Sequence, residues 1–350
     1  MWVYWVMFWW PALAAISFNG KPSADALRKL HLLIFAFVLC LVIGLRYQVG
    51  MDWGNYLEHL YLAQDLFLYE TLLHGDIGYW FLNWLAAQTG SGIWLVNLVA
   101  ATAFVGGLTA FCSRLPNPWL AITIAVPYMA IVMAMNYTRQ GAAFGLVLLG
   151  LLALQDGRIR RFGLMIIAAA LFHKTAVILL PLAALLKSRR NWVTLLGMSV
   201  FTVLAYVLFL AETYDALYET YIYQQYASDG AGIRVFMNAA AAITFIVFRK
   251  RYLMPEMQKH FWTWISVIAL LFIPALMISP SSTAVDRVAL YFMPLQLIAF
   301  SYFPVYFLSR TYQKLATLSV VGGYWLVMFV WFNYSNFYFA WLPYRFYPFE

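Results

Sequence analysis

The chain is a succession of apolar stretches of roughly 16 to 22 residues, separated by short segments that carry most of its charges. A helix rises about 1.5 Å per residue, so stretches of this length suit the roughly 30 Å hydrocarbon core of a bilayer. In lipid the backbone must satisfy its own hydrogen bonds, which favours helices. We therefore expect an all-α, polytopic membrane protein of about 10–13 transmembrane helices. The stretches are 1–18, 30–45, 92–112, 119–135, 139–155, 192–211, 234–248, 261–279, 287–308 and 315–333.

Composition agrees with this class. The chain is 64% hydrophobic and 10% charged, with too few polar residues to cover a water-soluble protein of 350 residues. Its net charge of +8 does not indicate a nucleic-acid partner, because the basic residues are spread over many loops. Cys40 and Cys112 both lie in apolar stretches and define neither a disulfide framework nor a metal cluster. Residues 1–18 lack the features of a cleaved signal peptide and are expected to form a retained span.

The basic loops predict how the chain is oriented. Loops rich in Lys and Arg lie on the cytoplasmic side of a membrane. By this rule the cytoplasmic segments are Lys21–Lys29, Arg158–Arg161, Lys187–Arg190, Arg249–Arg251 with Lys259, and Arg310–Lys314. The outer segments are then 46–76, 136–140, 212–233, 280–286 and the tail after Phe332. No internal repeat or linker is present, so we expect one integral membrane domain over 1–350.

Three segments do not fit a single crossing. Residues 162–186 have basic flanks on both sides but are too short to cross the core twice, which favours a re-entrant or broken hairpin with its tip at Phe172–Thr175. Residues 77–89 are expected to form a short helix at the outer face. The loop 46–76 contains apolar residues at helical spacing, which predicts an amphipathic helix.

Ionisable groups within or beside a membrane are costly, so they are candidates for a functional site. Six basic residues remain on the expected outer side or within the membrane: Arg46, Arg139, Lys174, Arg234, Arg287 and Arg345. Arg139 follows Asn136 where a new span begins. A guanidinium near a helix N-terminus suits a diphosphate. The alternative is an arginine that only anchors the helix at the lipid headgroups.

The other charged residues also have two readings. Lys174 beside His173 at the hairpin tip is either part of a site or a polar pair that braces the hairpin. Asp52 and Asp286 are either site carboxylates or N-caps of the helices that follow them. Arg234 ends an outer loop rich in tyrosines, which either stack on sugars or sit at the membrane interface.

Soluble-enzyme signatures are absent from the sequence: there is no Walker A loop, dinucleotide fingerprint, HExxH or nucleophile elbow. The outer carboxylates form no tight cluster with histidines, so we expect neither a metal nor a cofactor. Several outward-facing arginines instead indicate an anionic ligand.

The residues named so far resemble the EpsG-like branch of the Wzy-type polysaccharide polymerases. The motifs that carry the resemblance are Arg46-Tyr-Gln-Val-Gly50-x-Asp52-x-x-x-Tyr56, Gly78-Tyr-x-x-Leu82-Asn83, Asn136-x-x-Arg139-Gln140, Phe172-His173-Lys174-Thr175-Ala176, and Asp286-Arg287 with Tyr291. One departure is Asp76-Ile77 before Gly78, where such proteins tend to show Glu-Pro.

The resemblance implies a glycosyltransferase C-like enzyme in the bacterial inner membrane with its active site facing the periplasm. Such an enzyme polymerises oligosaccharide repeat units linked to undecaprenyl diphosphate, and a chain-length regulator is a candidate partner beside membrane lipids. The candidate bases that it implies are His173, Asp52 and Asp286. The candidate contacts to the donor are Arg46, Arg139, Gln140, Lys174, Arg234, Arg287, Tyr56 and Tyr291.

Three other functions share many of these features. A polysaccharide ligase differs only in its acceptor. A membrane O-acyltransferase also uses a buried histidine in a multi-span protein. A lipid-linked sugar transporter is the non-enzymatic alternative, although such proteins usually contain internal repeats.

Overall fold

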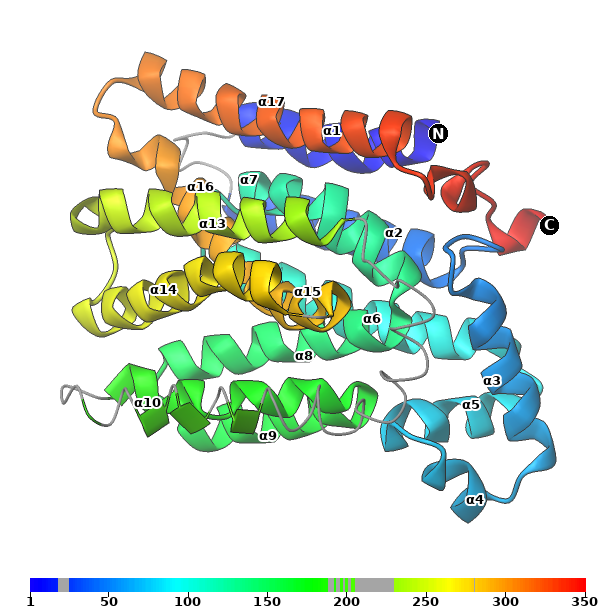
Figure 1. Ribbon diagram of the computed structural model, residues 1–350. Helices are drawn as coiled ribbons and strands as arrows, with labels where there is room; N and C mark the ends of the chain where they lie inside the picture. The colour runs from blue at the N-terminus through cyan, green and yellow to red at the C-terminus, as the bar shows by residue number, and fades with distance from the viewer. Residues whose placement is uncertain are drawn as a thin grey trace.

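The computed structural model describes residues 1–17, 25–187, 230–279 and 281–350, with isolated positions between 192 and 204. This part of the chain is a bundle whose long helices run roughly along one common direction, with α3 (Trp53–Asp65) lying across them at one end (Figure 1). Within it the extended pairing is limited to an isolated bridge between Arg46 and Phe346. The prediction of an all-α membrane protein is confirmed.

Six described helices are long and apolar enough to cross a membrane, which makes the chain a multi-pass membrane protein. They are α2 (Asp25–Gly44), α6 (Gly92–Ser113), α8 (Thr138–Gln155), α13 (Ala231–Phe248), α14 (Glu256–Ile278) and α17 (Arg310–Tyr334). A bent pair, α15 (Ser282–Leu290) and α16 (Pro294–Tyr302) with η5 (Phe303–Tyr306), adds a seventh if it is one broken span. The expected span 192–211 and loop 212–233 lie mostly outside the described residues.

The centre of the bundle is formed by α7 (Pro118–Ala125) and the π-helix η1 (Val126–Ala134), in which every residue is buried. Asn117 caps α7 by accepting the Leu120 N–H at 3.1 Å, and proline is well tolerated at the next position. Pro127 has no N–H to continue the α-helical ladder, and the chain widens into a π-helix there. The Ile131 carbonyl is bound by the Trp341 indole at 2.9 Å.

Two glycines allow α6 and α8 to cross in direct backbone contact. A Cβ added at Gly107 would lie 1.9 Å from the Gly145 carbonyl oxygen, and one added at Gly145 would lie 2.1 Å from that of Ala103. Close contact between small residues is a common way for membrane helices to associate. This crossing fixes α8, which begins at the candidate site.

The two ends of the bundle differ. At one end, on the right in Figure 1, lie α3 (Trp53–Asp65), α4 (Leu68–Leu73), α5 (Ile77–Thr89) and the C-terminus. The turn before α9 (Ile159–Phe172), the turn η4 (Arg249–Arg251) and the start of α17 lie at the opposite end. The amphipathic helix and the short helix expected from the sequence correspond to α3 and α5.

The segment 162–186 is a broken helix. α9 ends at Phe172, His173 is extended (φ −156°, ψ 104°), and the chain continues as the 3₁₀-helix η2 (Lys174–Leu179) and α10 (Leu182–Lys187). The break thus falls within the expected tip, at the end of the bundle that carries α5 (Figure 1).

Candidate functional site

Three elements meet at the buried carboxylate of Asp76, directly before α5. Its Oδ2 accepts a hydrogen bond from Arg139 Nη1 at 3.0 Å, and its Oδ1 accepts one from the Lys174 backbone N–H at 2.9 Å. His173 Nδ1 lies 3.7 Å from Oδ2. One carboxylate therefore joins the start of α8, the start of α5 and the hairpin tip.

Local sequence explains why these elements approach one another. A Cβ added at Gly78 would lie 2.9 Å from the Leu171 Cβ and 3.0 Å from its carbonyl oxygen, so glycine lets α5 pack against the end of α9. The extended backbone of His173 stops α9 and exposes the Lys174 N–H to Asp76. Gly78 and His173 together bring the acid to the tip.

Arg139 is held in place but is not covered. Its side chain is 35% exposed, whereas that of Asp76 is 4% exposed. The guanidinium lies 5.6 Å from the centroid of the Tyr79 ring, and Tyr79 packs against Tyr56 at 5.8 Å. This arrangement orients the guanidinium and leaves part of it accessible to a ligand.

A turn at Gly50 places Asp52 at the same end of the bundle as Asp76. Gly50 has a φ of +99°, and a Cβ there would lie 2.7 Å from the Met135 carbonyl oxygen. The Asp52 N–H donates to Asn136 Oδ1 at 3.1 Å, and Asn136 Nδ2 donates to Asp52 Oδ2 at 3.4 Å. The carboxylate makes no capping hydrogen bond to α3. Asp52 thus occupies the N-cap position of α3, and its carbonyl oxygen accepts the Tyr56 N–H at 3.1 Å, but its carboxylate is turned to Asn136 and does not cap the helix.

Residues of α15 and Tyr291, which directly follows it, complete the site. Gln140 donates to the Arg287 carbonyl oxygen at 3.0 Å, and the hydroxyls of Thr175 and Tyr291 are 3.2 Å apart. These contacts tie α15 to α8 and to the hairpin. The side chain of Arg287 is exposed. Its positive charge and that of Arg139 act on both Asp52 and His173, so these four residues share one electrostatic environment.

The two aspartates have opposite electrostatics. Burial raises the pKa of Asp52, although the nearby guanidinium groups of Arg287 and Arg139 oppose this shift. Burial also acts to raise the pKa of Asp76, but His173, the Lys174 N–H and Arg139 outweigh it and hold that pKa below its usual range. Asp76 is thus a firmly ionised anchor, and Asp52 is the carboxylate that takes up a proton more readily.

Arg46 is placed differently from Arg139. Its side chain is 1% exposed, and it donates to the Ile43 carbonyl oxygen at 2.6 Å and to Thr138 Oγ1 at 2.7 Å. These bonds hold the loop after α2 against the start of α8. The burial argues against the predicted contact between Arg46 and a diphosphate.

Arg234 is likewise enclosed. It binds both carboxylate oxygens of Asp286 and lies 5.2 Å from the centroid of the Tyr128 ring. Asp286 lies inside α15, which is capped by Ser281 through the Ala284 N–H at 3.2 Å, so the N-cap reading of Asp286 is wrong. The geometry also argues against Asp286 as a base, because both its oxygens are engaged.

The C-terminal segment braces the loop that contains Arg46. The Tyr47 N–H donates to the Arg345 carbonyl oxygen at 3.0 Å, and the Tyr347 N–H donates to that of Leu45 at 2.9 Å. Arg345 itself donates to Gln48 Oε1 at 2.8 Å. Among the residues that the structure describes, no three metal-ligating side chains come together.

Comparison with known protein families matches residues 29–346 of the chain to the EpsG family. The chain belongs to the EpsG family. The match includes every motif on which the resemblance was based, and the resemblance is confirmed. No curated protein matches the chain, and no solved structure does. Membership of the EpsG family supports a general role of the polysaccharide-polymerase type in polysaccharide biosynthesis.

Sequence reasoning missed Asp76, which it noted only as a departure from the Glu-Pro typical of EpsG-like proteins. A signal was available. A membrane protein with several cations near one face needs counterions there, and Asp76 lies two residues before Gly78 of the Gly-Tyr motif. Asn136 and Thr175 lie in the motifs on which the resemblance was based, and the structure shows that they contact Asp52 and Tyr291. The tyrosines of 214–226 lie outside the described residues.

Proposed function

We propose that this EpsG-family protein joins lipid-diphosphate-linked oligosaccharide units into a polysaccharide at the periplasmic face of the bacterial inner membrane. The observation that carries the proposal is the buried carboxylate of Asp76, which holds a partly exposed arginine, Arg139, beside His173. An oriented guanidinium next to a potential base suits transfer from a diphosphate leaving group.

The arrangement of charge supports the outward orientation. The basic turns at 158–161, 249–251 and 310–314 lie at the end of the bundle opposite α5, the helix that Asp76 precedes (Figure 1). The positive-inside rule assigns those turns to the cytoplasm. The candidate site is then on the other side, where lipid-linked units that have already crossed the membrane are available.

In the proposed mechanism, Arg139 and Arg287 bind the donor diphosphate. Both side chains are accessible, and the exposed Lys174 lies beside the same Asp76 contact. Gln140 holds the backbone of Arg287 in place. Fixed positive groups stabilise the charge that develops as the diphosphate leaves, and such groups commonly contribute a factor of about 10²–10³.

His173 is the proposed general base. Asp76 Oδ2 lies 3.7 Å from its Nδ1, and both ring nitrogens are buried without a hydrogen bond to the described residues, so the acceptor must enter the site to reach Nε2. This is the arrangement in which a carboxylate orients an imidazole whose other nitrogen takes a proton. The acceptor hydroxyl loses its proton to His173 as its oxygen bonds the anomeric carbon. The bond from that carbon to the diphosphate oxygen breaks, and the lipid diphosphate leaves with the electron pair.

Asp52 has a different proposed role. Its carboxylate is only half-buried and lies in the field of Arg139 and Arg287. We assign it to binding the acceptor sugar, because sugar hydroxyl groups can donate hydrogen bonds to a carboxylate. Its removal should therefore raise the KM for acceptor more than it lowers kcat.

The proposal is tested with purified protein and a lipid-diphosphate-linked repeat unit, without a nucleotide sugar or acyl donor. We expect a ladder of products that is lost in Arg139→Ala and His173→Gln. The matched control is Arg114→Ala, because Arg114 also pairs with an aspartate, Asp156, at 2.6 Å but at the opposite end of α8. This variant should retain the ladder.

Other outcomes separate the alternatives. Glycosylation of an added lipid or protein acceptor without a ladder would indicate a ligase. Loss of acyl groups from the polysaccharide with unchanged chain length in a deletion strain would indicate an acyltransferase. Uptake of the lipid-linked unit into vesicles without any new glycosidic bond would indicate a transporter. Each of these results would overturn the polymerase proposal.

A further inference from the structure

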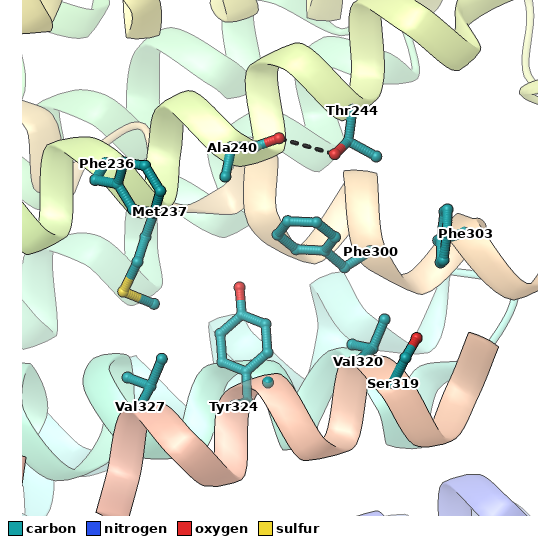
Figure 2. Close-up of a pocket in the computed structure, with 11 residues that line it drawn as sticks. Phe236, Met237, Ala240, Thr244, Phe300, Phe303, Ser319, Val320, Tyr324 and Val327 are labelled. Carbon is teal, nitrogen blue, oxygen red and sulfur yellow. Dashed lines mark hydrogen bonds between the residues drawn. The ribbon is translucent and has the colours of Figure 1, made fainter. Parts of the chain in front are cut away.

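A groove with a volume of about 310 Å³ lies between α13, the α16–η5 segment and α17 (Figure 2). Figure 2 shows Tyr324 rising from α17 between Met237 on α13 and Phe300 on the segment opposite. Aliphatic and aromatic side chains form most of the wall. Its volume is at the lower end of the range for small-molecule sites, about 300–1,000 Å³.

The hydroxyl groups in the wall are all engaged elsewhere. Thr244 donates to the Ala240 carbonyl oxygen at 2.8 Å, as the dashed line in Figure 2 marks. Ser319 donates to the Ala316 carbonyl oxygen at 2.9 Å, and Tyr324 donates to Gln296 Oε1 at 2.7 Å. Because these hydroxyl groups already donate within the protein, the wall offers few hydrogen-bond partners to an incoming molecule. The groove is suited to hydrocarbon.

The groove is flanked by surface that belongs in lipid. Phe236 and Ile243 on α13 and Leu326 on α17 are all exposed, and both helices are long and apolar enough to span a membrane. An opening between two such helices gives access from the bilayer. A hydrocarbon chain in the membrane can therefore enter sideways.

The groove extends to within about one helical turn of the Arg234–Asp286 pair, at the end of the bundle that contains the candidate site. Met237 is three residues, or about one helical turn, after Arg234, whose partner Asp286 precedes Arg287. A chain in the groove would thus emerge near the end of the bundle where Arg287 and Arg139 lie. A bulk phospholipid has no need of this continuity, whereas a substrate that joins a lipid chain to a diphosphate requires it.

We propose that this groove binds the part of the polyprenyl chain nearest the diphosphate of the donor. The proposal rests on the proposed function for the identity of the lipid. The groove's volume accommodates only a segment of such a chain, and the remainder lies in the bilayer. Binding in the groove aligns the anomeric carbon with the arginines, because it fixes the direction from which the diphosphate enters.

Two adjacent glycines provide a matched test. Gly323 lines the groove and Gly322 does not, and a Cβ added at either position meets nothing within 4 Å. Gly323→Leu should fill part of the groove from a Cβ position that is open, while Gly322→Leu adds the same side chain to the same helix outside the groove. Both changes also raise helix propensity.

We expect Gly323→Leu to raise the KM for a long-chain polyprenyl donor about tenfold, the loss that follows when two methylene groups leave the groove. The effect should be absent with a donor in which a methyl group replaces the polyprenyl chain, because such a donor leaves the groove empty, and Gly322→Leu should behave as wild type with both donors. Equal kinetics of the two variants with the long-chain donor would overturn the proposal.

A second measurement does not depend on turnover. A photoreactive polyprenyl diphosphate without sugar should label α13 or α17 in wild type, and Gly323→Leu should reduce this labelling while Gly322→Leu retains it. If an ordinary phospholipid competes as well as unlabelled polyprenyl diphosphate, the groove is a general lipid site and the inference is wrong. Specific labelling of a protein that makes no ladder would contradict the proposed function and leave the groove assignment standing.

Discussion

Two arginine–aspartate pairs at the same end of the bundle have different surroundings. In the pair of Arg234 and Asp286 the side chains are 7% and 5% exposed, and both carboxylate oxygens are bound. In the pair of Arg139 and Asp76 the aspartate is 4% exposed but the arginine is 35% exposed. The first pair is closed on itself, and the second presents its cation to the surroundings.

The difference separates scaffold from candidate site. A buried, bidentate pair satisfies its own charges and fixes α13 to α15, so a ligand gains little there. The open pair uses Asp76 as a fixed counterion and keeps donor groups of Arg139 available. The same pair of residue types therefore has two different roles. The exposure of the arginine, and not its charge, decides which pair can contact a substrate.

Breaking the closed pair should have the largest effect on stability. We expect Arg234→Ala to lower the free energy of unfolding by about 3–5 kcal/mol, because it leaves the Asp286 carboxylate buried without its partner. Arg139→Ala should lower the free energy of unfolding by at most about 2 kcal/mol, because the guanidinium of Arg139 is partly solvated. Thermal unfolding in detergent measures both.

A double variant sharpens this test. Arg234→Met with Asp286→Leu removes both charges and should recover most of the lost stability. A double variant as unstable as Arg234→Ala would show that packing, and not the unpaired charge, dominates. An Arg234→Ala protein of unchanged stability and abolished activity would contradict the assignment of the closed pair to the scaffold.

The contrast also explains what could be predicted from sequence. Helical spans follow from apolar length, and the chemistry-bearing residues of the EpsG motifs stand out as charges near a membrane. Arg46, Arg139 and Arg234 look alike at that level. Whether each is covered depends on distant segments: the C-terminal residues pair with the loop of Arg46, and Asp286 encloses Arg234. No local pattern carries that information.

Other features had weaker signals. Asp76 looked like an ordinary loop acid, because its partners at Arg139 and Lys174 are 63 and 98 residues away. The π-helix has only Pro127 as a local indicator, although its length helps to set the position of Asn136. The groove beside α17 arises from the packing of three helices and has no sequence motif.

Loosening the open pair should have an intermediate effect. We expect Asp76→Asn to reduce activity about 10²-fold, because Arg139 and His173 lose their common anchor and small displacements of catalytic groups are costly. Stability should fall by about 1–3 kcal/mol. Asp76→Glu keeps the charge, matches the acid typical of EpsG-like proteins, and should retain much of the activity in the ladder assay.

The stability cost of Asp76→Asn has a defined pH dependence. The folded protein holds the pKa of Asp76 low, so its carboxylate stabilises the fold above the unfolded pKa of about 3.9. That contribution is lost as the pH falls through the folded pKa. The difference in Tm between wild type and Asp76→Asn should therefore be constant from pH 5 to 8 and shrink in stronger acid. A difference that changes across pH 5 to 8 would point to His173 instead.

Asp52 should show the smallest effect and the opposite sign. Burial raises its folded pKa, so the folded protein binds this proton more tightly than the unfolded chain does. Wild-type stability then decreases as the pH rises from about 3.9 through the folded pKa, and the cost persists at neutral pH.

Asp52→Asn keeps a polar group beside Asn136 and removes that cost. We expect a small rise in Tm at pH 7 that disappears below about pH 3.9, together with weaker binding of the acceptor in the ladder assay. A lower Tm at pH 7 would mean that attraction to Arg287 and Arg139 outweighs burial, and that Asp52 anchors the arginines as Asp76 does.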